Sequence, residues 1–181
     1  TFVSEDVTKM IKYLKDNNYI CPDTNKVLMK GIMASEISEC NEIILTEVLN
    51  SDIFQDITKE EIVALVSTFI EEKSNKIGFE ELDVPKSLKD KLGHISYIAN
   101  DFGDYEYGEC RLDIGSDWNL YLSFIGPAYD WASGKSIYEI YNKYENIYEG
   151  TFIRNILRIN NIIENVKNIC VMVNNSDLLK K

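Results

Sequence analysis

Two of the chain's three arginines, Arg154 and Arg158, lie four residues apart in the segment YEGTFIRNILRINNII, residues 148–163. On a helix both guanidinium groups would lie on one face, together with Thr151 and Asn161 and with no acidic residue. Guanidinium groups bind phosphates and bases, and amides pair with base edges. The pattern is therefore typical of a nucleic-acid contact, although ion pairs with acids on neighbouring helices would also account for the arginines.

Other residue types that could do chemistry lack the spacing that the chemistry needs. The SGKS segment, residues 133–136, is like the end of a phosphate-binding loop, but Tyr129 stands where the first glycine of such a loop belongs. His94 is the only histidine, and no nucleophile motif accompanies it. Spacing alone does not separate a catalytic pair of carboxylates from a solvated helix face. We therefore predict no catalytic residue in this chain.

The cysteines are scattered without the close spacing that a zinc site requires. They are Cys21, Cys40, Cys110 and Cys170. Free thiols are typical of proteins in a reducing, intracellular compartment, which is where we expect this chain. No metal site and no bound cofactor are predicted within it.

Length, composition and charge limit the function further. The chain has 181 residues, of which 45% are apolar, so it can bury a sizeable core. No apolar run approaches the roughly 18 residues of a membrane-spanning helix, so no membrane partner is expected. A formal net charge of −11 opposes unaided, non-specific binding to nucleic acid but leaves room for a small, focused contact. Because the chain starts at Thr1 without a targeting pattern, we expect a fragment of a larger protein.

Apolar residues recur at helical spacing through almost the whole chain. Capping boxes predict helix starts at Thr58 and Ser136, Gly134 predicts a helix end, and Pro127 predicts either a kink or a helix start. The expected helices cover about residues 4–14, 29–38, 42–50, 58–72, 86–102, 118–133, 136–144 and 151–173, followed by a frayed tail. We therefore predict an all-α bundle of about seven helices that ends in one long helix.

Two separated blocks of the sequence together resemble the DSHCT domain, the C-terminal helical region of exosome-associated DExH-box RNA helicases. The first block lies within residues 28–73, and the second begins at Tyr129 and runs to residue 163. Matching residues include Lys30-Gly31, Glu36-Ile37-Ser38, Leu45-Thr46-Glu47, Trp131-Ala132, Glu149-Gly150 and Arg158. The resemblance divides the chain into an N-terminal helix and connector, residues 1–27, and a DSHCT-like helical domain, residues 28–181.

This resemblance implies an accessory domain that packs on two RecA-like motor domains and closes the channel for the unwound single strand of RNA. The helix from Thr151 is similar to the family's ratchet helix, which lies along the RNA. Carried over onto this sequence, Arg158 would contact RNA bases, Arg154 would pack or contact the backbone, and Glu72 would face the strand. ATP and Mg²⁺ would bind in motor domains outside this chain, within an ATP-dependent RNA helicase that acts in an RNA-processing complex.

The sequence departs from the family pattern along the same helix. Asn160 and Asn161 replace glutamates of the family, and Leu157 stands where the family often has a basic residue. These departures put an acid-dependent contact in question and leave fewer cations along the strand.

Two other functions remain open from the sequence alone. Residues 136–144 and the helix from Thr151 could form a helix-turn-helix DNA-binding module, with Arg154 near the start of the recognition helix. The net charge and the length of that helix weigh against this alternative. The acidic surface could also make the chain a protein-interaction scaffold that docks a basic partner.

Overall fold

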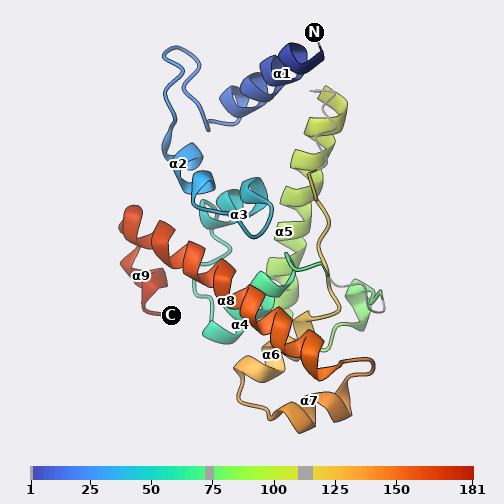
Figure 1. Cartoon of the computed structure of the whole chain (residues 1–181). Coiled ribbons are helices and arrows are strands. Elements are labelled where there is room, and N and C mark those ends of the chain that lie inside the picture. Colours follow the sequence, from blue (N-terminus) through green and yellow to red (C-terminus); the bar gives the residue numbers. More distant parts are fainter. Residues whose placement is uncertain (1, 72–75, 110–115) are drawn as a thin grey trace.

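The computed structural model describes residues 2–71, 76–109 and 116–181, and these ranges are helical without a β-strand (Figure 1). Within them, Ile20 and Val27 form one isolated antiparallel bridge. The helices are α1 (Phe2–Asp16), α2 (Met29–Ser35), α3 (Glu42–Leu49), α4 (Lys59–Ser67), α5 (Lys86–Asp104), α6 (Ile125–Ala132), α7 (Ile137–Lys143), α8 (Glu149–Met172) and α9 (Ser176–Leu179), with a 3₁₀ turn η1 (Phe79–Glu81) and a π-helix η2 (Tyr105–Glu109). The predicted all-α class is confirmed, and α8 is the predicted long C-terminal helix.

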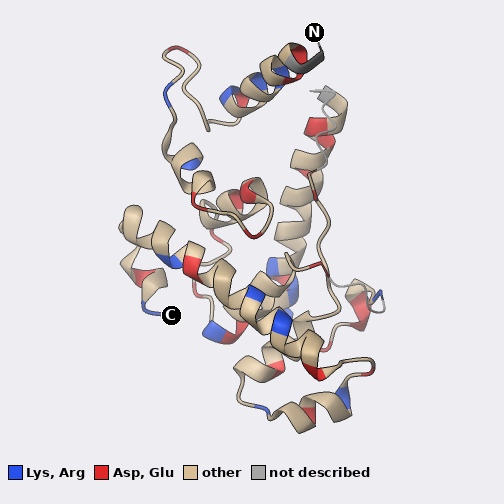
Figure 2. Cartoon of the chain, in the orientation of Figure 1, with Lys and Arg blue, Asp and Glu red and all other residues tan. Residues whose placement is uncertain are grey.

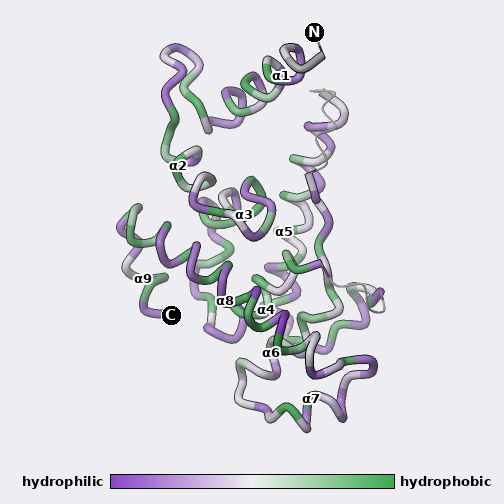
Figure 3. The backbone as a smooth tube through the Cα atoms, viewed as in Figure 1, coloured by the Kyte–Doolittle hydropathy of each residue, from purple (hydrophilic) through white to green (hydrophobic). Residues whose placement is uncertain are grey.

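Helix α4 lies at the centre of the bundle and contributes to two apolar clusters. Val66 packs with residues of α6 and α8, whereas Leu65 packs with residues of α3 and α5. In Figure 3 green and purple stretches alternate along these helices, as expected for helices that have one apolar side. The predicted cap is present, because the Thr58 hydroxyl accepts a hydrogen bond from the Glu61 amide at 3.1 Å. Glu61 is itself buried and forms an ion pair at 3.4 Å with Lys91 of α5.

The predicted helix 118–133 is wrong over its first half. Residues 116–122 lie outside any helix, and α6 begins only at Ile125. Pro127 occupies the first turn of α6, where its missing N–H costs no hydrogen bond, so it marks a helix start and not a kink. The amide of Tyr121 donates to the carbonyl oxygen of Thr68 at 2.8 Å. This contact with the end of α4 holds the segment outside a helix, and local periodicity does not reveal it.

Helix ends also differ from the predicted ones. Helix α5 continues to Asp104 and passes into η2, because aromatic rings near its end pack on Tyr13 of α1. Helix α4 ends at Ser67, before the predicted end at Glu72, which lies outside the described residues. The tail is not frayed over its whole length, since the Asn175 side chain caps the short helix α9 through the amide of Leu178 at 3.2 Å.

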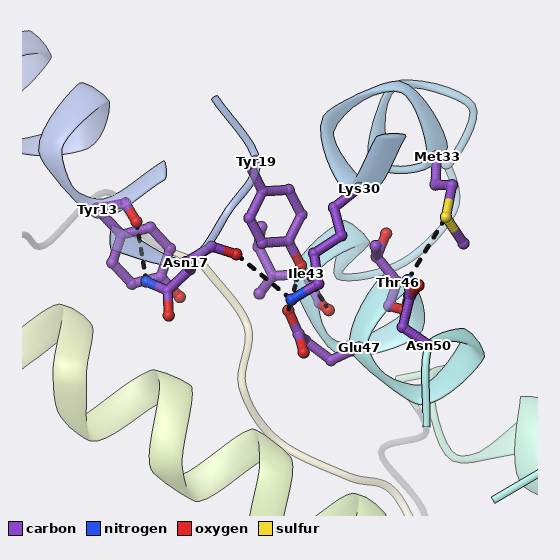
Figure 4. Close-up of polar contacts among 9 residues, drawn as sticks. All are labelled: Tyr13, Asn17, Tyr19, Lys30, Met33, Ile43, Thr46, Glu47 and Asn50. Atoms are coloured by element: carbon purple, nitrogen blue, oxygen red, sulfur yellow. Dashed lines mark hydrogen bonds and ion pairs between the residues drawn. The ribbon is translucent and has the colours of Figure 1, made fainter. Parts of the chain in front are cut away.

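A polar network fastens the segment after α1 onto α2 and α3 (Figure 4). The Lys30 ammonium lies 2.7 Å from a carboxylate oxygen of Glu47 and donates to the carbonyl of Asn17 at 3.4 Å. The buried Tyr19 hydroxyl donates to the same Glu47 oxygen at 3.0 Å. A Cβ atom on Gly31 would lie 2.5 Å from the Tyr19 carbonyl oxygen. The family-like residues Lys30, Gly31 and Glu47 therefore serve the packing of the domain.

Helix α1 leaves most of its apolar stripe in solvent. Val7, Met10 and Ile11 are 48%, 37% and 40% exposed, whereas Tyr13 is buried. Only the last turns of α1 reach the bundle, where Tyr13 packs with Phe102. The predicted amphipathic helix is thus present, but only its end, at Tyr13 and Leu14, joins the core of the described residues.

Candidate nucleic-acid interface

Helix α8 runs across one face of the molecule and carries both arginines of the predicted site (Figures 1 and 2). Its 24 residues span about 36 Å at the usual helical rise. One side of α8 packs on the cluster that includes α4 and α6. Because this packing fixes the rotation of the helix, the side chains on its free side have fixed directions.

Helical spacing in the sequence predicts that one apolar stripe of α8 faces the core, made of Phe152, Ile156, Ile159, Ile163, Val166 and Cys170. The buried side of α8 overlaps this stripe but is turned relative to it. Fully buried are Phe152, Asn155, Ile159, Ile162, Val166, Ile169 and Cys170, whereas the predicted Ile156 and Ile163 are only half-buried. On a helical projection the centre of burial lies about 40° closer to the arginine row than predicted. The difference arises because Ile162, Ile169 and the polar Asn155, which is 0% exposed, are buried on the side of the helix nearer the arginines. The arginine row consequently lies along the flank of α8 and not opposite the core.

This rotation decides how exposed each predicted site residue is. Arg154 and Asn161 lie farther from the core and are exposed, whereas Arg158 and Thr151 lie nearer to it and are half-buried. The structure therefore brings these four residues onto one flank of α8. The fifth predicted site residue, Glu72, lies outside the described residues.

The two arginines are not engaged in structural ion pairs within residues 2–71, 76–109 and 116–181. Every ion pair found in these ranges uses a lysine, for example Lys167 with Glu164 at 2.9 Å on α8 itself. Arg158 donates from Nη1 to the carbonyl oxygen of Glu71 at 3.5 Å, a long contact that orients the guanidinium at the edge of the helix. The ion-pair explanation of the arginines therefore has no support in the described part of the chain.

A cleft of about 330 Å³ opens beside Arg158. It is lined by Ser38, Glu39, Cys40, Asn41, Glu42, Phe69, Glu71, Ser116, Asp117, Asn119 and Arg158. Both carboxylate oxygens of Asp117 already accept hydrogen bonds within the chain, one from the amide of Asn119 and one from the Tyr121 hydroxyl. Four acids and one arginine give this cleft a negative charge, so it favours groups that donate hydrogen bonds and disfavours phosphate.

Two residues near the ends of the polar flank of α8, Asn165 and Thr151, are engaged within the domain itself. The Asn165 side-chain oxygen accepts a hydrogen bond from the amide of Ser38 at 3.3 Å, which joins α8 to the segment before α3. Thr151, near the other end of the row, lines a separate cleft of about 280 Å³ with Lys76 and Tyr144 among its neighbours. The part of α8 that is free for a ligand therefore lies between these two ends.

Sequence reasoning missed the residues that hold the turn leading into α8. Asp130 of α6 is buried, accepts hydrogen bonds from Lys143 at 2.9 Å and the Tyr144 hydroxyl at 2.8 Å, and lies 3.2 Å from Lys135. Burial acts to raise the pKa of Asp130, but these three hydrogen bonds outweigh it, so the pKa lies below the ordinary value. The charged carboxylate therefore ties the end of α7 to α6, five residues before α8 begins.

Two exposed aliphatic side chains beside the arginines were also missed. Ile153 and Leu157 are 47% and 60% exposed, and each directly precedes one of the arginines in the sequence. The sequence could have shown this pair, since Ile153 and Leu157 are four residues apart and therefore lie next to each other on one side of a helix.

Neither a metal centre nor a membrane span emerges from the described ranges. No group of three or more His, Cys, Asp or Glu side chains there is arranged to hold a metal ion. No helix there combines the length and apolarity needed to cross a bilayer.

Comparison with known proteins places these features in context. The family model described as the DSHCT (NUC185) domain matches residues 24–181. The chain is 30% identical to the antiviral helicase SKI2 of Saccharomyces cerevisiae, over 97% of this chain and 14% of that protein. It is 28% identical to the exosome RNA helicase MTR4 of Homo sapiens, over 84% of this chain and 14% of that protein. It is also 30% identical to the DExH-box ATP-dependent RNA helicase DExH9 of Arabidopsis thaliana, over 84% of this chain and 15% of that protein. The chain thus spans less than a fifth of the length of these curated relatives.

Proposed function

The chain belongs to the DSHCT (NUC185) domain family, and from this we propose that it is an accessory helical domain of an ATP-dependent RNA helicase. In this function α8 guides the unwound single strand of RNA during unwinding and processing. Relatives that are named as RNA helicases are much longer than this chain. Motor domains outside the chain would bind ATP and Mg²⁺ and would pack against the helices described above.

The observation that carries the proposal is the contrast between the lysines and the arginines. Lysines provide all the ion pairs of the described ranges, whereas Arg154 and Arg158 have no carboxylate oxygen within 4.0 Å there. The protein has 30 acidic residues, so guanidinium groups without acidic partners on one flank of one helix are unexpected for purely structural cations. The planar guanidinium suits base edges and phosphates better than an ammonium does.

The packing of α8 on the core supports a guiding role. Its buried side is fixed in the core, and the Asp130 contacts fix the turn before it. A helix held in this way presents Arg154 and Arg158 about 6 Å apart along its axis without further ordering, which lowers the entropic cost of contacting a strand.

The setting of the helicase follows from the relatives and is part of the proposal. One relative is named an exosome RNA helicase, which suggests an RNA-processing complex as the partner of the whole protein. Cys21, Cys40 and Cys170 are free thiols, in keeping with an intracellular, reducing compartment.

The proposal is tested by Arg158→Ala in the full-length helicase. Loss of this guanidinium should lower the rate of RNA unwinding several-fold while most RNA-stimulated ATP hydrolysis remains, because the motor is intact. Lys167→Ala is the matched control, since it removes a cation of α8 that is engaged with Glu164. Unwinding that stays at the wild-type rate in Arg158→Ala would refute the guiding role. Tight, sequence-dependent binding of duplex DNA by the chain would instead support the helix-turn-helix alternative.

A further inference from the structure

Asp130, Lys143 and Tyr144 join the end of α7 to α6, and we call these three residues the Asp130 cluster. The Asp130 carboxylate accepts hydrogen bonds from the Lys143 ammonium at 2.9 Å and from the Tyr144 hydroxyl at 2.8 Å. Burial, followed by the hydrogen bond to Asp130, raises the pKa of Tyr144 to about 12, so at neutral pH the hydroxyl keeps its proton and donates it. The cluster therefore holds the end of α7 on α6 throughout the neutral pH range.

The Tyr144 ring also fits closely against the first turn of α6. A Cβ atom on Gly126 would lie 2.7 Å from the Tyr144 hydroxyl oxygen and 2.8 Å from a carbon of its ring. Asp130 stands four residues after Gly126, on the same side of the helix. Helix α6 thus provides both the space for the Tyr144 ring and the acceptor for its hydroxyl. Together they fix where the end of α7 lies.

The two helices that the cluster joins also provide the surface on which the start of α8 packs. The Tyr141 ring of α7 makes an edge-to-face contact with Phe152 of α8, with 6.2 Å between the ring centroids. Phe124, which directly precedes α6, contacts Phe152 with 5.7 Å between the centroids. In the part of the chain that the structure describes, the buried Tyr141 hydroxyl has no hydrogen-bond partner, so packing alone holds this ring. The position of Phe152 therefore depends on how α7 lies on α6.

Phe152 lies close to both arginines along α8. Arg154 follows it by two residues and Arg158 by six, which is about 9 Å along the helix axis. Phe152 is 2% exposed, so it cannot move without disturbing its aromatic neighbours. Because a helix is stiff over this length, a shift of Phe152 also moves both guanidinium groups.

Given the proposed function, on which this inference rests, we propose that Asp130 and Tyr144 are positioning residues for strand guiding. They fix α7 on α6, the two helices determine where Phe152 packs, and Phe152 determines where the arginine flank of α8 lies relative to the strand. Neither residue contacts the RNA. Their replacement therefore acts on unwinding through the position of α8.

Unwinding by the full-length helicase tests the proposal, with RNA-stimulated ATP hydrolysis measured in parallel. Asp130→Asn should lower the rate of unwinding about fivefold while maximal ATP hydrolysis remains, because a misplaced flank loses its preorganisation for the strand. Gly126→Ala should have a similar effect without changing a charge, since its Cβ displaces the Tyr144 ring. Tyr144→Phe keeps the ring and loses only the hydroxyl, so its effect should be smaller and in the same direction.

A second network of a carboxylate, a lysine and a tyrosine provides the matched control. Glu47 of α3 lies 2.7 Å from the Lys30 ammonium and accepts a hydrogen bond from the Tyr19 hydroxyl at 3.0 Å, and this network joins α2 and α3 to the segment after α1 (Figure 4). Glu47→Gln should therefore cost a similar amount of stability but leave unwinding close to the wild-type rate, at a temperature where all variants are folded. Equal losses of unwinding in Glu47→Gln and Asp130→Asn would overturn the proposal, because the loss would then follow stability.

Combination with Arg158→Ala shows whether the effect passes through the arginine flank. If Asp130 acts by positioning the flank, Asp130→Asn should lower unwinding less in the Arg158→Ala background than in the wild-type helicase. A loss of full size in both backgrounds would overturn the proposal. If Arg158→Ala lowers unwinding while Asp130→Asn and Gly126→Ala do not, only this inference fails. If Arg158→Ala itself leaves unwinding unchanged, the proposed function fails and this inference with it.

Discussion

Replacing Asp130 by asparagine should destabilise the turn that leads into α8, while the shape of the side chain stays nearly the same. The carboxylate of Asp130 is buried and accepts hydrogen bonds from Lys143 at 2.9 Å and from the Tyr144 hydroxyl at 2.8 Å. Lys135 lies 3.2 Å from its other oxygen. The asparagine side chain would keep one acceptor oxygen but would lose the negative charge that these partners require.

The free-energy cost follows from how much water can replace the lost contacts. Removing one partner of a fully buried ion pair costs about 3–5 kcal/mol. The side chains of Lys143 and Lys135 are 33% and 43% exposed, so water solvates them in the variant and the cost is smaller. Hydrogen bonds to charged groups contribute about 1.5–3 kcal/mol each. We therefore expect Asp130→Asn to lower the free energy of unfolding by about 2 kcal/mol.

Urea denaturation of the 181-residue chain measures this difference, with Asp83→Asn as the control. Asp83 contacts the same Lys143 at 3.2 Å but is 85% exposed, so its replacement should cost about 0.5 kcal/mol or less. Equal destabilisation by the two variants would refute the reasoning, because burial would then have no part in the cost. A loss below about 0.5 kcal/mol in Asp130→Asn would refute it as well.

The pH dependence of the same variant has a definite sign. The folded-state pKa of Asp130 lies below its ordinary value of 3.8. A depressed pKa contributes stability that is fully present above the unfolded-state value and is lost as the pH falls through the folded-state value. The difference between the wild-type chain and Asp130→Asn should therefore be constant near neutral pH and should shrink below a pH of about 3.8.

Two further predictions concern close packing and thiol reactivity. Gly31→Ala should destabilise the chain, because the new Cβ would lie 2.5 Å from the carbonyl oxygen of Tyr19, whereas Gly93→Ala in α5 meets no atom within 4 Å and should stabilise it by about 0.5–1 kcal/mol. Thermal melts of both variants test this, and equal shifts of the two in one direction would contradict it. In the folded chain Cys21 should react with a thiol reagent near neutral pH well before Cys40, because the Thr24 hydrogen bond lowers the pKa of Cys21 and burial raises that of Cys40 to about 12. Mass spectrometry after timed alkylation gives the order, and faster labelling of Cys40 would contradict it.

Features of the fold that depend on local sequence were predictable. The cap at Thr58, the capping box at Ser136 with Glu139 and the left-handed Gly134, whose φ is 95°, all occur where the sequence places them. Such signals act within one turn of helix, so tertiary contacts rarely alter them. A helix start near Pro127 was one of two alternatives, and α6 begins at Ile125, with the contact between Tyr121 and Thr68 holding the preceding segment outside the helix.

Features that depend on packing between distant segments were not predictable. The sequence does not show that Asn155 is buried together with Ile162 and Ile169, which sets the buried side of α8 about 40° from the expected one. It also does not show that the apolar stripe of α1 stays exposed, because that depends on what α1 packs against. For the candidate site, the residue types and their common flank were predicted, whereas the exposure of Leu157 and the role of Asp130 required the fold.

A photocrosslinking amino acid at position 161 tests most directly whether α8 lies along the RNA. Asn161 is exposed on the flank that carries both arginines, so its replacement should not disturb the core. Tyr138 of α7, which is 80% exposed, is the control position. In the full-length helicase bound to a single strand of RNA, position 161 should crosslink to the RNA and position 138 should not. No crosslink at position 161, or equal crosslinking at both positions, would contradict the proposal that α8 guides the strand.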